Sequence, residues 1–167
     1  GKLRQKEEVA LEKRRTFARF GIKSKYGKRQ IKEDDIKRVF NVKLVSERLS
    51  LSGVVDMAII TPYEVIPVDF KDGAFSVGEV VALHHKYQLL GYGLLLEEVY
   101  NRRSERGFIL SLEDGSTKSV YFTDGARMYL TGKLRKLREM ITNEIIPEES
   151  PYRGRCRECE FKPICKG

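Results

Sequence analysis

Hydrophobic and polar residues follow two different periods along the chain, and the shorter period dominates its first half. "NVKLVSERLSL", from Asn41 to Leu51, alternates apolar and polar residues, which predicts a half-buried strand. Two more apolar runs follow, each bounded by turn residues. The predicted elements of this half are a short helix at residues 33–40, strands at 41–51, 54–60 and 64–70, and turns at 52–53 and 61–62.

Helical spacing of apolar residues appears at both ends of the chain and at its centre. The central segment, "EVVALHHKYQLLGYGLLLEEVY", is the most apolar and predicts a buried helix over 79–100. We expect Asp124 to cap the last helix. The remaining predicted elements are a helix over 2–19, a strand pair at 106–112 and 118–123 joined through 113–116, and a helix over 124–145.

This order of elements predicts the fold class. A helix, three strands, a helix, two strands and a final helix describe one α/β domain with a mixed central sheet flanked by helices. We assign residues 1–146 to this core. From Pro147 onward the chain is rich in proline and holds all three cysteines. We expect 147–167 to form a cysteine tail packed on the same domain.

Composition narrows the class of protein. The chain has 167 residues, of which 41% are hydrophobic and 34% charged, a balance typical of globular domains. No apolar run reaches the length of about 20 residues that spans a bilayer, so we expect no membrane partner and a cytoplasmic location. The net charge of +8 suits a polyanionic partner such as nucleic acid. Solvated helix faces would also explain the basic runs.

Three charged residues interrupt the predicted strands. Asp56 stands inside an apolar strand, and Asp69 and Lys71 end the next one, on the same face of that strand. Neighbouring strands can bring the two carboxylates together, where a hard cation such as Mg²⁺ or Mn²⁺ would neutralise them. The alternatives are a hydrogen-bonded buried Asp56 and a surface ion pair between Asp69 and Lys71.

The central helix adds two polar side chains to one face. Gln88 and Tyr92 are four residues apart and project together. Core packing with polar tips is the alternative interpretation of this pair. His84 and His85 lie one turn earlier on the same helix, and we assign them no catalytic part.

Cysteines occur only in the tail, at Cys156, Cys159 and Cys165. Three closely spaced thiols without a secretion signal favour a metal or cluster over disulfides, since the odd count leaves a disulfide scheme incomplete. A structural zinc site is the alternative and would need a fourth ligand.

Taken in order, "GVVD", "PVDFK" and "QLLGY" resemble the G-x-x-D, [D/E]-x-K and Q-x-x-x-Y signature of RecB-like nucleases in the restriction-endonuclease-like, PD-(D/E)xK superfamily. The cysteine tail is similar to that of its iron–sulfur members, and the small size is similar to the CRISPR-associated RecB-like exonucleases. The resemblance implies a restriction-endonuclease-like core. It also implies that Asp56, Asp69 and the backbone carbonyl of Phe70 bind the metal. Lys71, Gln88 and Tyr92 would complete the catalytic set.

The same resemblance implies a Mg²⁺- or Mn²⁺-dependent exonuclease for single-stranded DNA ends in CRISPR spacer acquisition, with integrase proteins as partners. The three cysteines would bind an iron–sulfur cluster, 4Fe–4S if a fourth cysteine lies upstream and 2Fe–2S otherwise. Gln5 stands where the family has a metal-binding histidine. Two alternatives remain: a catalytically impaired DNA-binding or assembly subunit of the spacer-acquisition complex, and a DNA-repair nuclease of the same superfamily.

Overall fold

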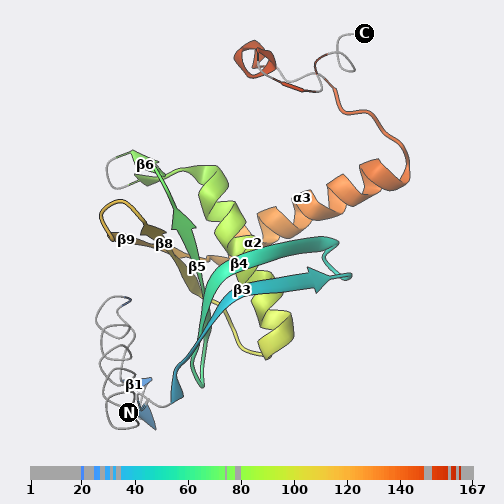
Figure 1. The fold of residues 1–167 in the computed structure, drawn as a ribbon. Helices are drawn as coiled ribbons and strands as arrows, with labels where there is room; N and C mark the ends of the chain where they lie inside the picture. The colour runs from blue at the N-terminus through green and yellow to red at the C-terminus, as the bar shows by residue number, and fades with distance from the viewer. Residues whose placement is uncertain are drawn as a thin grey trace.

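A computed structural model gives the fold of the chain (Figure 1). It describes residues 20, 25–26, 29–30, 32, 35–73, 75–77, 80–148, 152–157, 159–160 and 162. The helix predicted over 2–19 lies outside these residues.

One five-stranded mixed sheet forms the centre of the molecule, with the strand order β3-β4-β5-β8-β9. The first three strands form an antiparallel meander, β5 and β8 are parallel, and β9 returns antiparallel to β8. The α/β fold class and mixed sheet predicted from the sequence are therefore confirmed. The strands of the sheet are β3 (Lys37–Ser46), β4 (Leu51–Ile60), β5 (Val65–Lys71), β8 (Arg106–Ser111) and β9 (Thr117–Tyr121).

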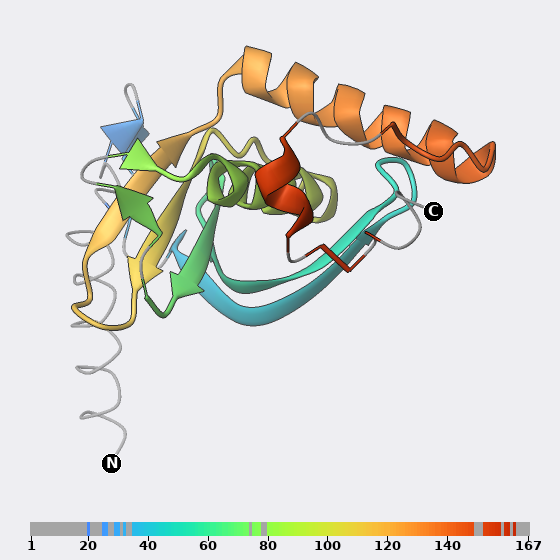
Figure 2. The ribbon, with the colours of Figure 1, turned by 90° about the horizontal axis from the view of Figure 1, so that it is seen from above.

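Two helices lie on one side of this sheet. The parallel strands β5 and β8 need a crossover connection, and α2 (Leu83–Tyr100) supplies it. Figures 1 and 2 show β3 and β4 curving around α2, while α3 (Asp124–Thr142) passes along the other side of that helix and extends beyond the sheet. No helix in the described part of the chain is long and apolar enough to cross a membrane.

Short elements complete the described structure. They are the two-stranded pairs β1 (Lys25–Tyr26) with β2 (Arg29–Gln30) and β6 (Ser76–Val77) with β7 (Val80–Val81), and the single-turn 3₁₀ helix η2 (Arg153–Cys156).

The strand β5 is buried on both faces over residues 65–68, which explains why its sequence begins with a continuous apolar run. Ile66 and Val68 pack with Phe108 and Phe20 on one side of the sheet. Val65 packs with residues of α2 on the other side, where two further apolar clusters lie. Burial on both faces fixes the orientation of every side chain along β5.

Polar contacts join α3 to the end of α2. The guanidinium of Arg127 donates to Glu97 Oε2 at 3.1 Å and to the backbone carbonyl of Ser104. The other oxygen of Glu97 accepts from the backbone N–H of Ser104 at 2.7 Å. These contacts hold the first turn of α3 against α2.

Three local predictions were wrong. Residues Lys37 to Phe40 belong to β3 rather than to a short helix, because their pairing with β4 overrides local helix propensity. The first turn lies at Glu47–Ser50, where the N–H of Ser50 donates to the Glu47 carbonyl, and Ser52-Gly53 lie within β4. Thr123, not Asp124, caps α3, since its Oγ1 accepts from the N–H of Ala126 at 3.2 Å.

The central helix is shorter than predicted. Residues 80–82 precede α2, which begins at Leu83, and Val80 and Val81 form β7 with β6. The strand pair β8–β9 and the end of α2 at Tyr100 agree with the prediction to within two residues.

Close packing of α2 against the residues that flank β8 and β9 can be tested at Gly93. A β-carbon there would lie 2.8 Å from Cε2 of Phe122 and 2.9 Å from Oγ of Ser104, whereas Gly132 on α3 has nothing within 4 Å. We expect Gly93→Ala to lower the free energy of unfolding by about 1–3 kcal/mol through overpacking. Gly132→Ala should raise it by about 0.5–1 kcal/mol through helix propensity. Urea denaturation measures both, and equal shifts in the two variants would contradict this packing.

Candidate metal centre

Strand pairing brings the two predicted carboxylates together. The β4–β5 ladder pairs Ile60 with Val65 and runs to Met57 opposite Val68. Continued by one residue, the same register sets Asp56 opposite Asp69, and directly opposed residues share a face of an antiparallel pair. The two carboxylates are close enough for Asp56 to act on the pKa of Asp69.

The side chain of Asp56 takes the place of a backbone acceptor at the end of the β4–β5 ladder. Its Oδ2 accepts the backbone N–H of Phe70 at 2.7 Å, where an antiparallel ladder would otherwise offer a backbone carbonyl. Past this point β5 continues to pair with β8, as Asp69 faces Ile109 and Lys71 faces Ser111. The carboxylates therefore lie at the place where backbone pairing between β4 and β5 stops.

Asp69 is a buried carboxylate with an incomplete set of partners. Only 3% of its surface is exposed. Its Oδ2 lies 2.9 Å from Nζ of Lys71, within ion-pair distance, but receives no hydrogen bond of good geometry. Burial raises the pKa of Asp69 above its ordinary value of 3.8; Lys71 lowers the pKa and the neighbouring Asp56 raises it, with a net upward shift.

A divalent cation would relieve both features of this site. It would offset the repulsion between Asp56 and Asp69 and would coordinate the Asp69 oxygen that receives no well-aligned hydrogen bond, so the donor set fits a hard cation such as Mg²⁺ or Mn²⁺. Within the described residues, no three His, Cys, Asp or Glu side chains gather into a ready-made metal cluster. The remaining ligands would then be backbone carbonyls, water or substrate oxygens, as is common for Mg²⁺.

Lys71 is held by a chain of polar side chains that leads to α2. Its Nζ donates to Gln88 Oε1 at 3.2 Å, and Gln88 Nε2 donates to the hydroxyl of Tyr92 at 3.0 Å. Gln88 and Tyr92 are one helical turn apart, which lets the amide bridge the ammonium and the phenol. The structure thus unites Asp56, Asp69, Lys71, Gln88 and Tyr92 in one continuous site.

Gly53 explains how β4 and α2 approach so closely. A β-carbon at Gly53 would lie 2.9 Å from Cε1 of Tyr92. The absence of a side chain lets the Tyr92 ring lie directly over β4, three residues before Asp56. The first and last of the three motifs are therefore in direct contact.

His85 belongs to the same site, although the sequence pattern predicts no catalytic part for it. Its half-buried ring lies on the first turn of α2, and its Nδ1 is buried without a hydrogen-bond partner in the described structure. Burial lowers its pKa below 6.5, and the neighbouring His84 and Lys71 lower it further, while Asp69 and Gln88 oppose the shift. The sequence spacing could have placed His85 in the site, since His85 and Gln88 are three residues apart and therefore share one helix face.

Other predicted ligands remain predictions. Gln5 and Cys165 lie outside the described residues. Cys156 and Cys159 are free thiols, the first half-buried at the end of η2 and the second exposed. The backbone carbonyl of Phe70 stays a predicted metal ligand.

Comparison with known proteins identifies the family. A family model described as the PD-(D/E)XK nuclease superfamily matches residues 2–166. The chain belongs to this superfamily, which agrees with its mixed α/β fold. The resemblance to CRISPR-associated RecB-like nucleases is also confirmed by the relatives found in sequence comparison.

The chain is similar to several proteins named CRISPR-associated exonuclease Cas4. The protein from Francisella tularensis subsp. novicida is 26% identical over 96% of this chain and 73% of its own length. The Aeropyrum pernix protein is 28% identical over 87% of this chain and 72% of its own length. A Rhodospirillum rubrum protein named as a fusion of exonuclease Cas4 and endonuclease Cas1 is 27% identical over 81% of this chain, which corresponds to 23% of the fusion.

The raised pKa of Asp69 predicts a pH-dependent cost to the metal-free fold. A carboxyl group whose pKa is higher in the folded state binds protons more tightly there, so stability falls as the pH rises through and above 3.8. In EDTA, Asp69→Asn should therefore be more stable than the unmodified protein near pH 7, and the difference should shrink toward pH 3. Urea denaturation across this range measures the difference. The stability difference, variant minus unmodified protein, should be larger at pH 7 than at pH 3. A smaller difference at pH 7 would contradict the upward pKa shift of Asp69.

Proposed function

We propose that the protein is a Mg²⁺- or Mn²⁺-dependent exonuclease that digests single-stranded DNA ends during CRISPR spacer acquisition. The observation that carries the proposal is the proximity of Asp56 to the buried Asp69 beside Lys71, because a cation would offset the repulsion between the two carboxylates and coordinate the Asp69 oxygen that receives no well-aligned hydrogen bond. Membership of a nuclease superfamily and similarity to proteins named as Cas4 exonucleases support the same activity.

Asp56 and Asp69 would hold the metal, with the Phe70 carbonyl as a further ligand. A metal bound there supplies Lewis-acid activation of water and neutralises charge on the phosphate. The side chains around it have complementary tasks. Lys71 offers a positive charge to a phosphate oxygen, and it is kept in position by Asp69 on one side and Gln88 on the other.

Tyr92 and Gln88 support this arrangement from α2. Gln88 donates to the Tyr92 hydroxyl, which leaves the phenolic hydrogen available to a DNA phosphate or to water. Gln88 is exposed and therefore accessible to substrate, whereas Asp69 is not. We propose that the pair positions the attacking water or the DNA backbone relative to the carboxylates.

Digestion assays with Asp69→Asn test the site. We expect this variant to lose at least about 100-fold in Mn²⁺-dependent shortening of end-labelled single-stranded DNA, since even the loss of an outer-shell partner costs 10- to 100-fold at metal sites. Asp72→Asn is the matched control, because Asp72 is an exposed carboxylate just after β5 and should retain activity. Circular dichroism checks that both variants fold.

Equal activity of the Asp69 and Asp72 variants would show that the metal site is elsewhere. Unmodified protein that binds DNA in Mn²⁺ without shortening it would instead favour a DNA-binding or assembly subunit. A role in spacer acquisition is supported by the fusion of the Rhodospirillum rubrum relative with an endonuclease Cas1, and we propose integrase proteins of that kind as partners.

Cys156, Cys159 and Cys165 are the proposed ligands of an iron–sulfur cluster. Two free thiols three residues apart in the described part of the tail support this assignment. Protein purified without oxygen should contain iron and sulfide and absorb visible light, and Cys159→Ser should lose most of the iron while Arg157→Gln retains it. Zinc in place of iron, with no colour, would contradict a cluster and support a structural zinc site.

A further inference from the structure

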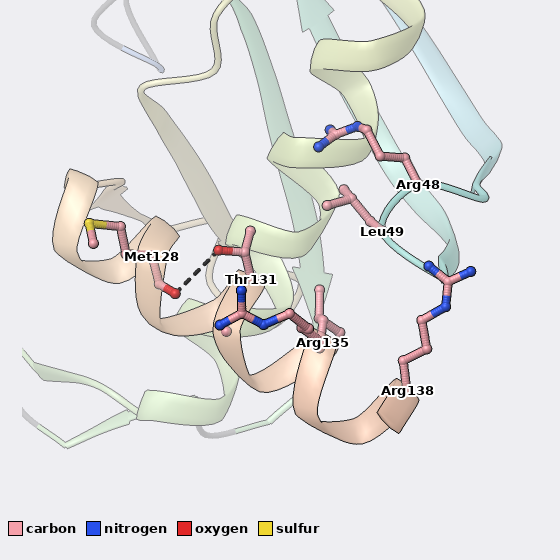
Figure 3. Close-up of a pocket in the computed structure, with 8 residues that line it drawn as sticks. Arg48, Leu49, Met128, Thr131, Arg135 and Arg138 are labelled. Carbon is pink, nitrogen blue, oxygen red and sulfur yellow. Dashed lines mark hydrogen bonds between the residues drawn. The ribbon is translucent and has the colours of Figure 1, made fainter. Parts of the chain in front are cut away.

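A basic hollow lies beside α3, outside the candidate metal centre. Its volume is about 600 Å³, and it is formed between the turn that joins β3 to β4 and residues of α3 from Met128 to Arg138. Figure 3 shows Arg48 and Leu49 on the turn, with Thr131, Arg135 and Arg138 on the helix. The basic run at Lys133 to Glu139, which the candidate metal centre does not use, thus contributes two of the arginines.

The charge in this hollow is largely uncompensated. Arg48 forms an ion pair with Glu98 on α2. Arg135 and Arg138 are exposed and have no ion-pair or hydrogen-bond partner in the described residues. The other residues that line the hollow carry no charge, and Leu49, Leu134 and Met128 give it an apolar floor. Such a surface suits a ligand that combines anionic groups with apolar faces.

A second, smaller hollow of about 220 Å³ is lined by residues that neighbour those of the first hollow along the chain. Opposite α3, Leu49 of the turn lines the first hollow and Leu51, the first residue of β4, lines the second. On α3, the first contains Leu134 and the second contains Leu130, one helical turn away.

The second hollow is bounded at its far side by residues of the site itself. Gly53, Gln88 and Tyr92 line it, and Gln88 accepts the hydrogen bond from Lys71. The two hollows therefore follow one seam between the β3–β4 turn and α3, which begins at the arginines and ends at Gln88 and Tyr92.

We propose that this seam binds single-stranded nucleic acid, with Arg135 and Arg138 contacting phosphates of the strand whose end occupies the metal centre. Guanidinium groups bind phosphate in a planar, two-pronged geometry, and grooves for single strands combine such charge with apolar contact to the bases. The assignment rests on the proposed nuclease function and adds the residues that hold the rest of the substrate.

The length of α3 determines how far these arginines lie from the candidate metal centre. Leu130 lines the hollow next to the site, and Arg138 lies eight residues further along α3, which corresponds to about 12 Å at 1.5 Å per residue. The arginines would therefore contact phosphates a few nucleotides from the end that is digested. Their loss should weaken binding of the strand without changing the chemical step.

The test compares two double variants that remove the same charge from the same helix. Arg135→Gln/Arg138→Gln alters the seam, and Lys133→Gln/Lys136→Gln alters exposed lysines that do not line either hollow. Binding is measured in the Asp69→Asn background, by fluorescence anisotropy of a labelled single strand of about 20 nucleotides over a range of KCl. Two lost phosphate contacts should reduce the slope of log K against log[salt] by about 1.4 in the arginine variant.

The lysine control should keep a slope close to that of its parent. A slope lowered equally in both double variants would overturn the proposal, because any positive charge on the helix would then attract the strand. A slope lowered in neither variant would also overturn it, because the arginines would then make no phosphate contact. Loss of binding to poly-L-glutamate in the arginine variant, with DNA binding unchanged, would also overturn it and indicate an acidic protein partner. Circular dichroism and urea denaturation check that both variants are folded.

Digestion kinetics separate this proposal from the function on which it rests. With Asp69 intact and Mn²⁺ present, the arginine variant should show a raised KM and an unchanged kcat on the same strand. Normal digestion with no change in KM or salt slope would overturn the proposal that the seam binds the strand. The proposed nuclease activity would then still stand. Absence of digestion, with the salt slope still lowered only by the arginine substitutions, overturns the nuclease and supports the seam as a nucleic-acid site.

Discussion

The pairing register between β4 and β5 is the constraint on which the candidate metal centre depends. Met57 faces Val68, so the next residues outward are Asp56 and Asp69. A slip of one residue would turn the side chains of one strand to the opposite face and separate the carboxylates. Apolar packing prevents the slip, because Ile66 and Val68 are buried on one side of the sheet while Val65 is buried on the other. Ordinary core residues therefore fix the position of the charged ones.

The site also requires the ladder to stop where it does. If the N–H of Phe70 were bonded to a backbone carbonyl of β4, Asp56 would lose its role as acceptor and the strands would continue side by side. Gly53 has a related effect, since it lets the Tyr92 ring lie against β4 and so brings Gln88 within reach of Lys71. Two backbone features, an ended ladder and a missing side chain, thus determine which polar groups can meet.

Much of this could be predicted from the sequence because strand and helix periods place side chains reliably. The spacing of Asp69 and Lys71, and of Gln88 and Tyr92, is enough to assign each pair to one face of its strand or helix. The helix expected at 33–40 failed because pairing with β4 decided the structure of Lys37 to Phe40. His85 and the arginine hollow depend on where α2 and α3 lie against the sheet, and no local pattern specifies such an approach.

The sequence separation of the paired strands bears on the order of folding. β4 and β5 are joined by the short segment 61–64, whereas the parallel pair Val68 and Phe108 must close a loop of about forty residues. Because the entropic cost of closure grows with loop length, we expect the β4–β5 hairpin to form before the crossover. The two carboxylates would then meet before α2 can bring Gln88 to Lys71. Lys71 itself lies two residues from Asp69 on the same strand face, so the nascent hairpin already carries its own counter-ion.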